Sequence, residues 1–210
     1  MQNSITVALP KGKLFNRSVE MLSKAGWTAE NLSEKSRKLL ITNPETNINF
    51  IITKSADVPT FVEYGAADIG IIGLDVLAES NKNVFQLLDL QFGFCHLMFA
   101  VHKDNLKKNL QDYSFSTVAT KFPRLAQNFF NQNNLHMQII PLHGSIELGP
   151  ICGLADSIVD IVETGTTLRE NNLVEVVNIM NFSARLIANR VSYKLNFDRI
   201  NKLVQDLKRG

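Results

Sequence analysis

The sequence contains few residues of the kinds that hold structural metals or form disulfides. Only two of its 210 residues are cysteines, Cys95 and Cys152, and their separation matches no metal-ligand spacing. We expect both cysteines to be buried thiols in a protein of a reducing compartment. The four histidines also lack metal spacing, so we expect them to be structural or surface residues: His96, His102, His136 and His143.

The chain also lacks a long apolar run and an excess of charge of either sign. No stretch approaches membrane-spanning length, and the N-terminus leads into an expected strand without an apolar signal segment. The net charge is only +2, from 22 basic and 20 acidic residues, so no long-range field favours nucleic acid. We therefore expect a cytoplasmic protein that binds neither membrane nor nucleic acid and whose anion sites come from local clusters.

Short apolar segments alternate with helical patterns along most of the chain, which is typical of an α/β protein. We expect helices over residues 14–25, 57–65, 105–110, 124–134 and 190–208. The expected strands include residues 4–9, 50–53, 66–73, 84–90, 94–101, 115–119, 137–140 and 157–162. Residues 174–189 have no helical period and many β-branched side chains, so we expect strands there too.

The segment after the expected strand 157–162 predicts an anion-binding loop. It reads Glu-Thr-Gly-Thr-Thr from Glu163 to Thr167, and a helix is expected to open at Leu168. Loop N–H groups, threonine hydroxyls and the first N–H groups of a helix all favour a phosphate, and Gly165 lets the backbone approach it closely. The alternative is a simple capping loop, in which a threonine caps the next helix.

Two carboxylates near this loop indicate a second task besides phosphate binding. Asp160 lies in the expected strand and Glu163 begins the loop. A carboxylate beside a bare phosphate would repel it, so we expect these acids to accept hydrogen bonds from sugar hydroxyls or to hold Mg²⁺. Phosphate, a ribose diol and Mg²⁺ together describe phosphoribosyl pyrophosphate.

Basic residues also follow two expected strands in the first half of the chain. Lys11, Gly12 and Lys13 follow the first strand, and Lys54 follows the strand at residues 50–53. A basic loop at the carboxyl end of a strand suits an anionic ligand, although a solvated turn is the simpler alternative. Asp75 opens a later helix, and it is either a helix cap or a ligand contact. Lys121 and Arg124 likewise flank a strand end and are either pyrophosphate contacts or surface residues.

These segments together resemble the signature of the ATP phosphoribosyltransferase family. The resemblance in the second half of the chain includes Glu147, Gly153, Ala155, Ile158, Asp160 and the residues from Thr164 to Leu168. Residues 9–13 resemble a Leu-x-Lys-Gly-Arg/Lys segment of the family, and residues 36–38 resemble its Ser-Arg-Lys segment. Lys13 provides a point charge where an arginine would provide a planar fork.

The resemblance implies a reaction and two groups of binding residues. Members of this family join N1 of ATP to C1 of phosphoribosyl pyrophosphate and release pyrophosphate, which is the first step of histidine biosynthesis. The residues implied for phosphoribosyl pyrophosphate are Asp160, Glu163, Thr164, Gly165, Thr166 and Thr167. Those implied for ATP are Lys11, Gly12, Lys13, Arg37, Lys54 and Asp75. Mg²⁺ is implied as the cofactor, carried mainly by the substrate, with Asp160 and Glu163 as the nearest carboxylates.

The resemblance also implies the domain arrangement: two α/β lobes around a cleft, as in type II periplasmic binding proteins. We expect a discontinuous first lobe on the ATP side, residues 1–89 and 174–210, and a second lobe, residues 90–173, that carries the phosphate loop. The chain ends after the last expected helix, so it resembles the short form of the family. We expect a homodimer within a hetero-oligomer, with a regulatory subunit related to histidyl-tRNA synthetase and no histidine-feedback site in this chain.

A second function class remains open on the residues alone. A non-catalytic cytosolic module that binds an anionic metabolite would carry similar loops on a similar two-lobed fold. No residue is marked by the sequence as a general base, and none is required, because adenine N1 is already a neutral nucleophile with a lone pair. Basic residues in one half and the Asp/Thr loop in the other favour two substrates, and therefore an enzyme.

Overall fold

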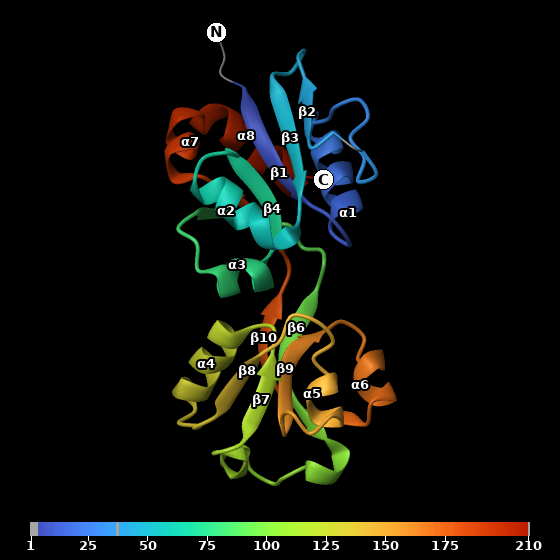
Figure 1. Cartoon of the computed structure of the whole chain (residues 1–210). Coiled ribbons are helices and arrows are strands. Elements are labelled where there is room, and N and C mark those ends of the chain that lie inside the picture. Colours follow the sequence, from blue (N-terminus) through green and yellow to red (C-terminus); the bar gives the residue numbers. More distant parts are fainter. Residues whose placement is uncertain (1–3, 37, 210) are drawn as a thin grey trace. The chain divides into compact units, whose positions relative to one another are not determined.

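The structure, a computed structural model, describes residues 4–36 and 38–209, which belong to two compact units (Figure 1). The first unit consists of Met1–Gly93 and Ser183–Gly210, and the second consists of Phe94–Phe182. Each unit has its own sheet and its own buried apolar clusters. The first unit is therefore discontinuous in sequence, and the second is a single inserted segment.

A six-stranded mixed sheet forms the centre of the first unit. Its order is β2-β3-β1-β4-β11-β5, and β3, β1 and β4 are parallel. The strands are β1 (Ile5–Pro10), β2 (Leu40–Asn43), β3 (Ile48–Thr53), β4 (Ile69–Gly73), β5 (Phe85–Asp89) and β11 (Ala184–Ala188). The helical segments are α1 (Phe15–Lys24), η1 (Ser55–Asp57), α2 (Val58–Glu63), α3 (Leu74–Ser80), α7 (Arg190–Leu195) and α8 (Phe197–Arg209).

Alternation of side chains along these strands places helices on both faces of the sheet. Val7 and Leu9 of β1 belong to a cluster with Leu22 of α1 and Leu203 of α8. Ala8, between them, points the other way and packs in a cluster with α2 and α3. Strands that are covered on both faces read as continuous apolar runs, which is why β1 and β4 were recognisable from the sequence.

A five-stranded sheet forms the centre of the second unit, in the order β10-β6-β9-β7-β8. Strand β6 is antiparallel to β9 and β10, whereas β7, β8 and β9 are parallel. The strands are β6 (Cys95–His102), β7 (Thr117–Thr120), β8 (Gln138–Pro141), β9 (Ser157–Val162) and β10 (Leu173–Phe182). The helical segments are η2 (Lys103–Asn105), η3 (Leu110–Tyr113), α4 (Pro123–Gln132), α5 (Leu148–Ile151) and α6 (Thr166–Glu170).

The core of the second unit also has two sides. Met98 and Ile158 pack with Leu168 of α6 on one face. On the other face, Phe99 meets Tyr113 and Phe130 edge to face, with ring centroids 5.3 and 5.8 Å apart. The buried Leu168 therefore anchors the start of α6 and, with it, the loop that precedes this helix.

The boundary between the units lies later than the sequence suggested. Residues 174–182 were assigned to the first lobe, but β10 pairs with β6 from Leu173↔His102 to Phe182↔Cys95, so this strand belongs to the second unit. Only β11 returns to the first sheet, between β4 and β5. Both strands are adjacent in a stretch with many β-branched residues, and the sequence pattern does not show which sheet each strand joins. The first boundary lies after Gly93 instead of residue 89.

Three local expectations were wrong. The expected helix at residues 105–110 is replaced by the 3-10 turns η2 and η3, the second of which begins with a reciprocal cap between Asn109 and Asp112. The expected helix at residues 190–208 is two helices separated at Asn196, so Val191 and Leu195 are exposed instead of joining the core. Both cysteines are free, but Cys152 is exposed and Cys95 is only partly buried.

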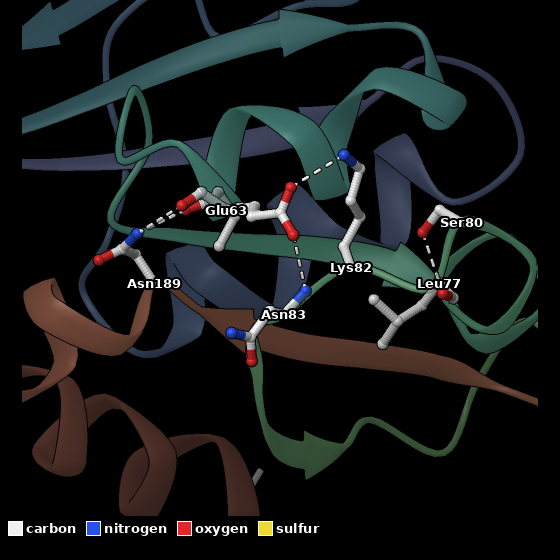
Figure 2. A network of polar contacts seen from close by, with 7 residues as sticks. Glu63, Leu77, Ser80, Lys82, Asn83 and Asn189 are labelled. Atoms are coloured by element: carbon white, nitrogen blue, oxygen red, sulfur yellow. Dashed lines mark hydrogen bonds and ion pairs between the residues drawn. The ribbon is translucent and has the colours of Figure 1, made fainter.

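A network of polar contacts fixes the point at which the chain turns from β11 into α7 (Figure 2). Asn189 accepts hydrogen bonds from the N–H groups of Val191 and Ser192, and so caps α7. Its amide also donates to the carbonyl oxygens of Val62 and Glu63 at 2.9 and 3.0 Å, at the C-terminal end of α2. One side chain therefore hydrogen-bonds to backbone groups at the ends of two helices, although the Val62 carbonyl also accepts from the Gly65 N–H at 3.1 Å.

The carboxylate of Glu63 extends this network to the segment before β5. It accepts from Lys82 Nζ and from the Asn83 N–H, both at 2.8 Å (Figure 2). These two contacts lower the pKa of Glu63 below its ordinary value, with Lys82 as the larger cause. Arg190 donates in turn to Asn83 Oδ1 at 2.8 Å. The ends of α2, α3 and β11 are thus linked by hydrogen bonds as well as by packing.

None of the helices formed by residues 4–36 and 38–209 has both the length and the apolar character needed to cross a bilayer.

Asn189→Ala should destabilise the first unit by about 1–2 kcal/mol, because it removes the cap of α7 and the side-chain donor to the Val62 and Glu63 carbonyls, of which Val62 keeps the Gly65 N–H. Asn189→Asp keeps the capping oxygen but turns a second, negatively charged oxygen toward these carbonyl groups, so it should recover the cap and not the contact with α2. Urea unfolding monitored by circular dichroism measures both, and Asn131→Ala, which removes one exposed hydrogen bond to Gln127, is the matched control. A loss for Asn189→Ala no larger than that of the control would contradict the role given to Asn189.

Candidate functional site

Three parallel strands of the first unit end at one edge of its sheet. The β1–β3 register pairs Pro10 with Thr53, so Lys11 and Lys54 follow neighbouring strand ends. From β1 the chain continues to β3 on one side, and β4 then lies on the other side of β1. This change of direction is the point at which open α/β sheets bind their ligands. The structure therefore brings the predicted residues Lys11, Gly12, Lys54 and Asp75 to the same edge.

The loop after β1 is held in a defined conformation. The Lys11 N–H donates to Thr53 O at 2.8 Å, and Ser55 Oγ donates to Lys11 O at 3.3 Å. Gly12 has a φ of 95°, a conformation that residues with a Cβ avoid. Lys11, Gly12 and Lys13 are all exposed, so this loop lies at the surface of the edge.

One residue of this site was not predicted. The Gly12 N–H donates to Glu34 Oε1 at 2.7 Å, across 22 positions of sequence. A backbone N–H that donates to a carboxylate has the exposure and direction needed to donate to another anionic oxygen. No sequence pattern connects Glu34 with Gly12, because the contact depends on how the segment before β2 folds back.

The remaining predicted residues of the first unit differ in environment. Lys54 is exposed at the end of β3. Asp75 is not the N-cap of α3, because the helix begins at Leu74 and Gly73 occupies the N-cap position. Burial raises the pKa of Asp75, although the backbone N–H groups of Val76 and Asp75 oppose this. Arg37 lies outside the described residues.

In the second unit, β9 leads into the predicted phosphate loop. Gly165 adopts a φ of 73° and stands at the N-cap of α6, so the chain turns sharply between Thr164 and Thr166. The hydroxyl oxygens of these two threonines are 3.2 Å apart. Thr164, Thr166 and Thr167 are exposed, which leaves their hydroxyl groups accessible to a ligand.

The helix after the loop contributes less than the sequence suggested. It begins at Thr166 instead of Leu168, and it is only five residues long. A helix of little more than one turn has few aligned peptide dipoles, so its own field at the loop is weak. The positive charge that a phosphate needs must come from side chains.

Arg169, which was not predicted, brings such a charge to the loop. Its Nη1 donates to Thr164 O at 3.3 Å, and its Nη2 donates to Thr166 Oγ1 at 3.2 Å. The guanidinium lies over Gly165, since a Cβ added there would be 3.3 Å from Nη1. The sequence did contain a signal for this residue, because Arg169 is the only basic residue between Glu163 and Glu170.

Asp160 occupies an unusual electrostatic environment on β9. The pKa of Asp160 is raised to about 6; burial is the largest cause, and the charge of Glu147 acts in the same direction. The Ile161 N–H, which donates to Asp160 Oδ1 at 2.8 Å, and the charge of Lys121 act in the opposite direction. Two carboxylates that repel each other near one cation can hold a proton or attract a metal ion.

Lys121 belongs to the same edge of the second sheet as the loop. It follows β7, which is parallel to β9, so the carboxyl ends of both strands lie at this edge. Arg124 is one residue into α4, which begins at Pro123, and it has interactions of its own. Within residues 4–36 and 38–209, no group of three or more His, Cys, Asp or Glu side chains is arranged to hold a metal ion.

Comparison with known proteins identifies a single family. The family model described as HisG, ATP phosphoribosyltransferase, matches residues 54–209. The ATP phosphoribosyltransferase of Desulfitobacterium hafniense is 48% identical over 214 residues, which cover 99% of this chain and 96% of that protein. That of Moorella thermoacetica is 49% identical over 213 residues, with 99% and 93% covered.

Solved structures agree on the fold. The ATP phosphoribosyl transferase (HisG:HisZ) complex from Thermotoga maritima contains a chain with a TM-score of 0.83 and 32% identity, and the match covers 98% of this chain and 100% of that one. The periplasmic aliphatic sulphonate binding protein SsuA from Escherichia coli has a TM-score of 0.62 at 13% identity, with 100% and 72% covered. At that identity the second likeness concerns the fold alone, and it matches the predicted class of periplasmic binding proteins.

Asp160→Asn should stabilise the protein at neutral pH, with a gain that disappears as the pH falls. The folded state binds the Asp160 proton more tightly than the unfolded state, so ionisation destabilises the fold as the pH rises from 3.8 to about 6. Asparagine keeps an oxygen for the Ile161 N–H and removes this cost. Urea unfolding at pH values below and above this window measures the difference between variant and wild type.

Asp156→Asn is the control with the opposite sign. Hydrogen bonds from the side chain and backbone of Thr117 lower the pKa of Asp156, so its charge stabilises the fold above pH 3.8. This variant should lose stability at neutral pH, and the loss should shrink in acid. An Asp160→Asn protein less stable than wild type at neutral pH would contradict the environment described for Asp160.

Proposed function

Because the chain belongs to the ATP phosphoribosyltransferase family, we propose that it joins N1 of the adenine of ATP to C1 of phosphoribosyl pyrophosphate and releases pyrophosphate. This reaction is the first step of histidine biosynthesis. The observation that carries the proposal is the Thr164–Thr167 loop, which combines exposed hydroxyl groups, a left-handed glycine and a guanidinium at the carboxyl end of β9. Each of these features suits a phosphate group.

The loop of the second unit is proposed to hold phosphoribosyl pyrophosphate. Thr164, Gly165, Thr166 and Thr167 would bind the 5′-phosphate through hydroxyl and backbone N–H groups. Asp160 and Glu163 would accept hydrogen bonds from the ribose hydroxyls. Lys121, at the same edge of the sheet, supports this assignment, because a cation there can meet the pyrophosphate.

The edge of the first sheet is proposed to hold ATP. Lys11, Lys13 and Lys54 would neutralise the triphosphate, and the Gly12 N–H would donate to one of its oxygens. Arg37 and Asp75 complete the proposed set. The support for this assignment is the position of these residues at the change of strand direction beside β1, where α/β sheets bind nucleotides.

A divalent metal is used by this family, and we propose that here it is Mg²⁺ carried mainly by phosphoribosyl pyrophosphate. The described residues fit this arrangement. Glu147 raises the pKa of Asp160, and a nearby divalent cation would relieve that repulsion. With no cluster of three metal-binding side chains among residues 4–36 and 38–209, the substrate oxygens would supply most of the ligands. The ion would neutralise charge on the departing pyrophosphate.

The chemistry then depends on position and charge. Adenine N1 has a lone pair and needs no activated nucleophile, so the protein must hold it in line with C1. Charge accumulates on pyrophosphate as it leaves, and cations such as Lys121 stabilise that state more than the ground state. We assign no general base.

We also propose a regulatory subunit related to histidyl-tRNA synthetase, bound to a homodimer of this chain. The solved Thermotoga maritima structure that this chain resembles is a HisG:HisZ complex. The proposed substrates are metabolites of the cytoplasm, and we place the protein there.

The second candidate is a non-catalytic cytosolic module that binds an anionic metabolite. One assay separates the two. Purified protein is mixed with ATP, Mg²⁺ and phosphoribosyl pyrophosphate, with and without the regulatory partner, and pyrophosphate release is measured. Release that requires both substrates supports the enzyme, whereas binding without release in either mixture supports the module.

Gly165→Ala should lower the affinity for phosphoribosyl pyrophosphate by about tenfold or more, because the added carbon meets Arg169 and prevents close approach of the phosphate. Gly153→Ala is the control. Gly153 has a similar φ of 69°, and a Cβ there would meet nothing within 4 Å. Gly153 lies before β9, whereas the phosphate loop lies after β9. Calorimetric titration measures both, and equal losses of affinity would show only backbone strain.

Lys54→Gln should raise the Michaelis constant for ATP several-fold and leave that for phosphoribosyl pyrophosphate unchanged. Loss of one cation beside a polyphosphate weakens binding by about 1 kcal/mol at an exposed position. Lys24→Gln, an exposed lysine of α1 paired with Glu20, removes the same charge in the same unit. A selective effect of Lys54→Gln on the other substrate would show that the two units have been assigned in reverse.

A further inference from the structure

The phosphate loop contains little positive charge, and its backbone does not make up for this. Between Glu163 and Glu170 the chain has two carboxylates and a single basic residue, Arg169. The five-residue helix α6 contributes little dipole field. Within the loop itself, Arg169 is therefore the one side chain that can bring a positive charge to a phosphate at the threonines, while Lys121 follows the neighbouring strand β7.

The contacts of Arg169 place its charge where this phosphate would bind. Nη1 and Nη2 hold Thr164 O and Thr166 Oγ1, which lie on the two sides of Gly165. These hydrogen bonds use two of the five N–H donors of a guanidinium. The same group lies over the glycine that allows close approach to the backbone.

We propose that Arg169 binds the 5′-phosphate of the sugar substrate and orients the loop around it. The inference rests on the proposed function of this loop and adds a specificity-determining residue to it. By donating to Thr166 Oγ1, Arg169 leaves the hydroxyl proton of Thr166 to be donated elsewhere, either to Thr164 Oγ1, 3.2 Å away, or to a phosphate oxygen. The guanidinium therefore acts twice, as a cation for the phosphate and as the group that makes Thr166 a donor.

The planar fork is essential to this double action. Two nitrogens of one rigid plane reach two loop oxygens, whereas the ammonium of lysine is a point charge on a flexible chain. Arg169→Lys would keep the charge and lose the orientation of Thr166. Arg169→Gln would lose both the charge and the fork. If Arg169 only braced the loop, its loss would not distinguish ligands that have a 5′-phosphate from pyrophosphate, which has none.

The experiment measures binding to the purified full-length chain by calorimetry with three probes: phosphoribosyl pyrophosphate, ribose 5-phosphate and inorganic pyrophosphate. For Arg169→Gln we expect the affinity for the first two to fall about tenfold or more, as for one charge-assisted hydrogen bond. The affinity for pyrophosphate should be unchanged. Arg169→Lys should recover part of the loss. Lys108→Gln, which removes one exposed charge from the same unit, should leave all three affinities unchanged.

The outcomes separate this inference from the proposed function. If wild type binds phosphoribosyl pyrophosphate and ribose 5-phosphate, and Arg169→Gln binds them equally well, then the role of Arg169 is overturned and the function of the loop survives. An equal loss for pyrophosphate in Arg169→Gln, or a lowered melting temperature that accounts for the loss, would make Arg169 a structural brace and also overturn the inference. A wild type that binds neither sugar phosphate overturns the proposed function and the inference with it.

Discussion

The parallel pairing of neighbouring strands is the constraint on which both sites depend. Because β1 and β3 are in register from Ile5↔Ile48 to Pro10↔Thr53, the residues that follow them emerge together at one edge. The pairing of β7 with β9 does the same for Lys121 and the threonine loop. Parallel strands need covered faces, and the helices that cover them supply the connections in which these loops occur. Residues far apart in sequence are therefore gathered at one edge of each sheet.

A chain with almost no net charge must bind polyanions by local placement. The net charge of +2 gives no general attraction, and Lys11, Lys54, Lys121 and Arg169 each occupy a position next to a strand end or glycine turn. Carboxylates lie near some of these cations: Glu34 accepts from the Gly12 N–H beside Lys11, and the charge of Lys121 acts on Asp160. Such a mixture favours ligands that offer both phosphate and hydroxyl groups over a bare phosphate.

Sequence patterns predicted the features that depend on local chemistry. The apolar runs of β1 and β4, and the glycine turns at Gly12 and Gly165, follow from burial on both faces and from positive φ. The patterns did not predict the sheet to which β10 belongs, because its apolar residues would suit either one. They also did not predict Glu34 or Arg169, whose partners are fixed by how a loop folds back and by how a short helix turns. Strands and turns can be predicted from local sequence, whereas contacts between residues distant in sequence cannot.

The contact between Glu34 and Gly12 limits what the first loop can contribute to binding. An anionic ligand that takes the Gly12 N–H replaces one carboxylate acceptor with another oxygen, so the exchange of this hydrogen bond is nearly neutral. The displaced Glu34 becomes solvated, but its negative charge stays close to the loop. Net attraction must therefore come from Lys11, Lys13 and Lys54, whose charges are not cancelled by the exchange. The glycine then determines where an oxygen is held, and the lysines determine how strongly it is held.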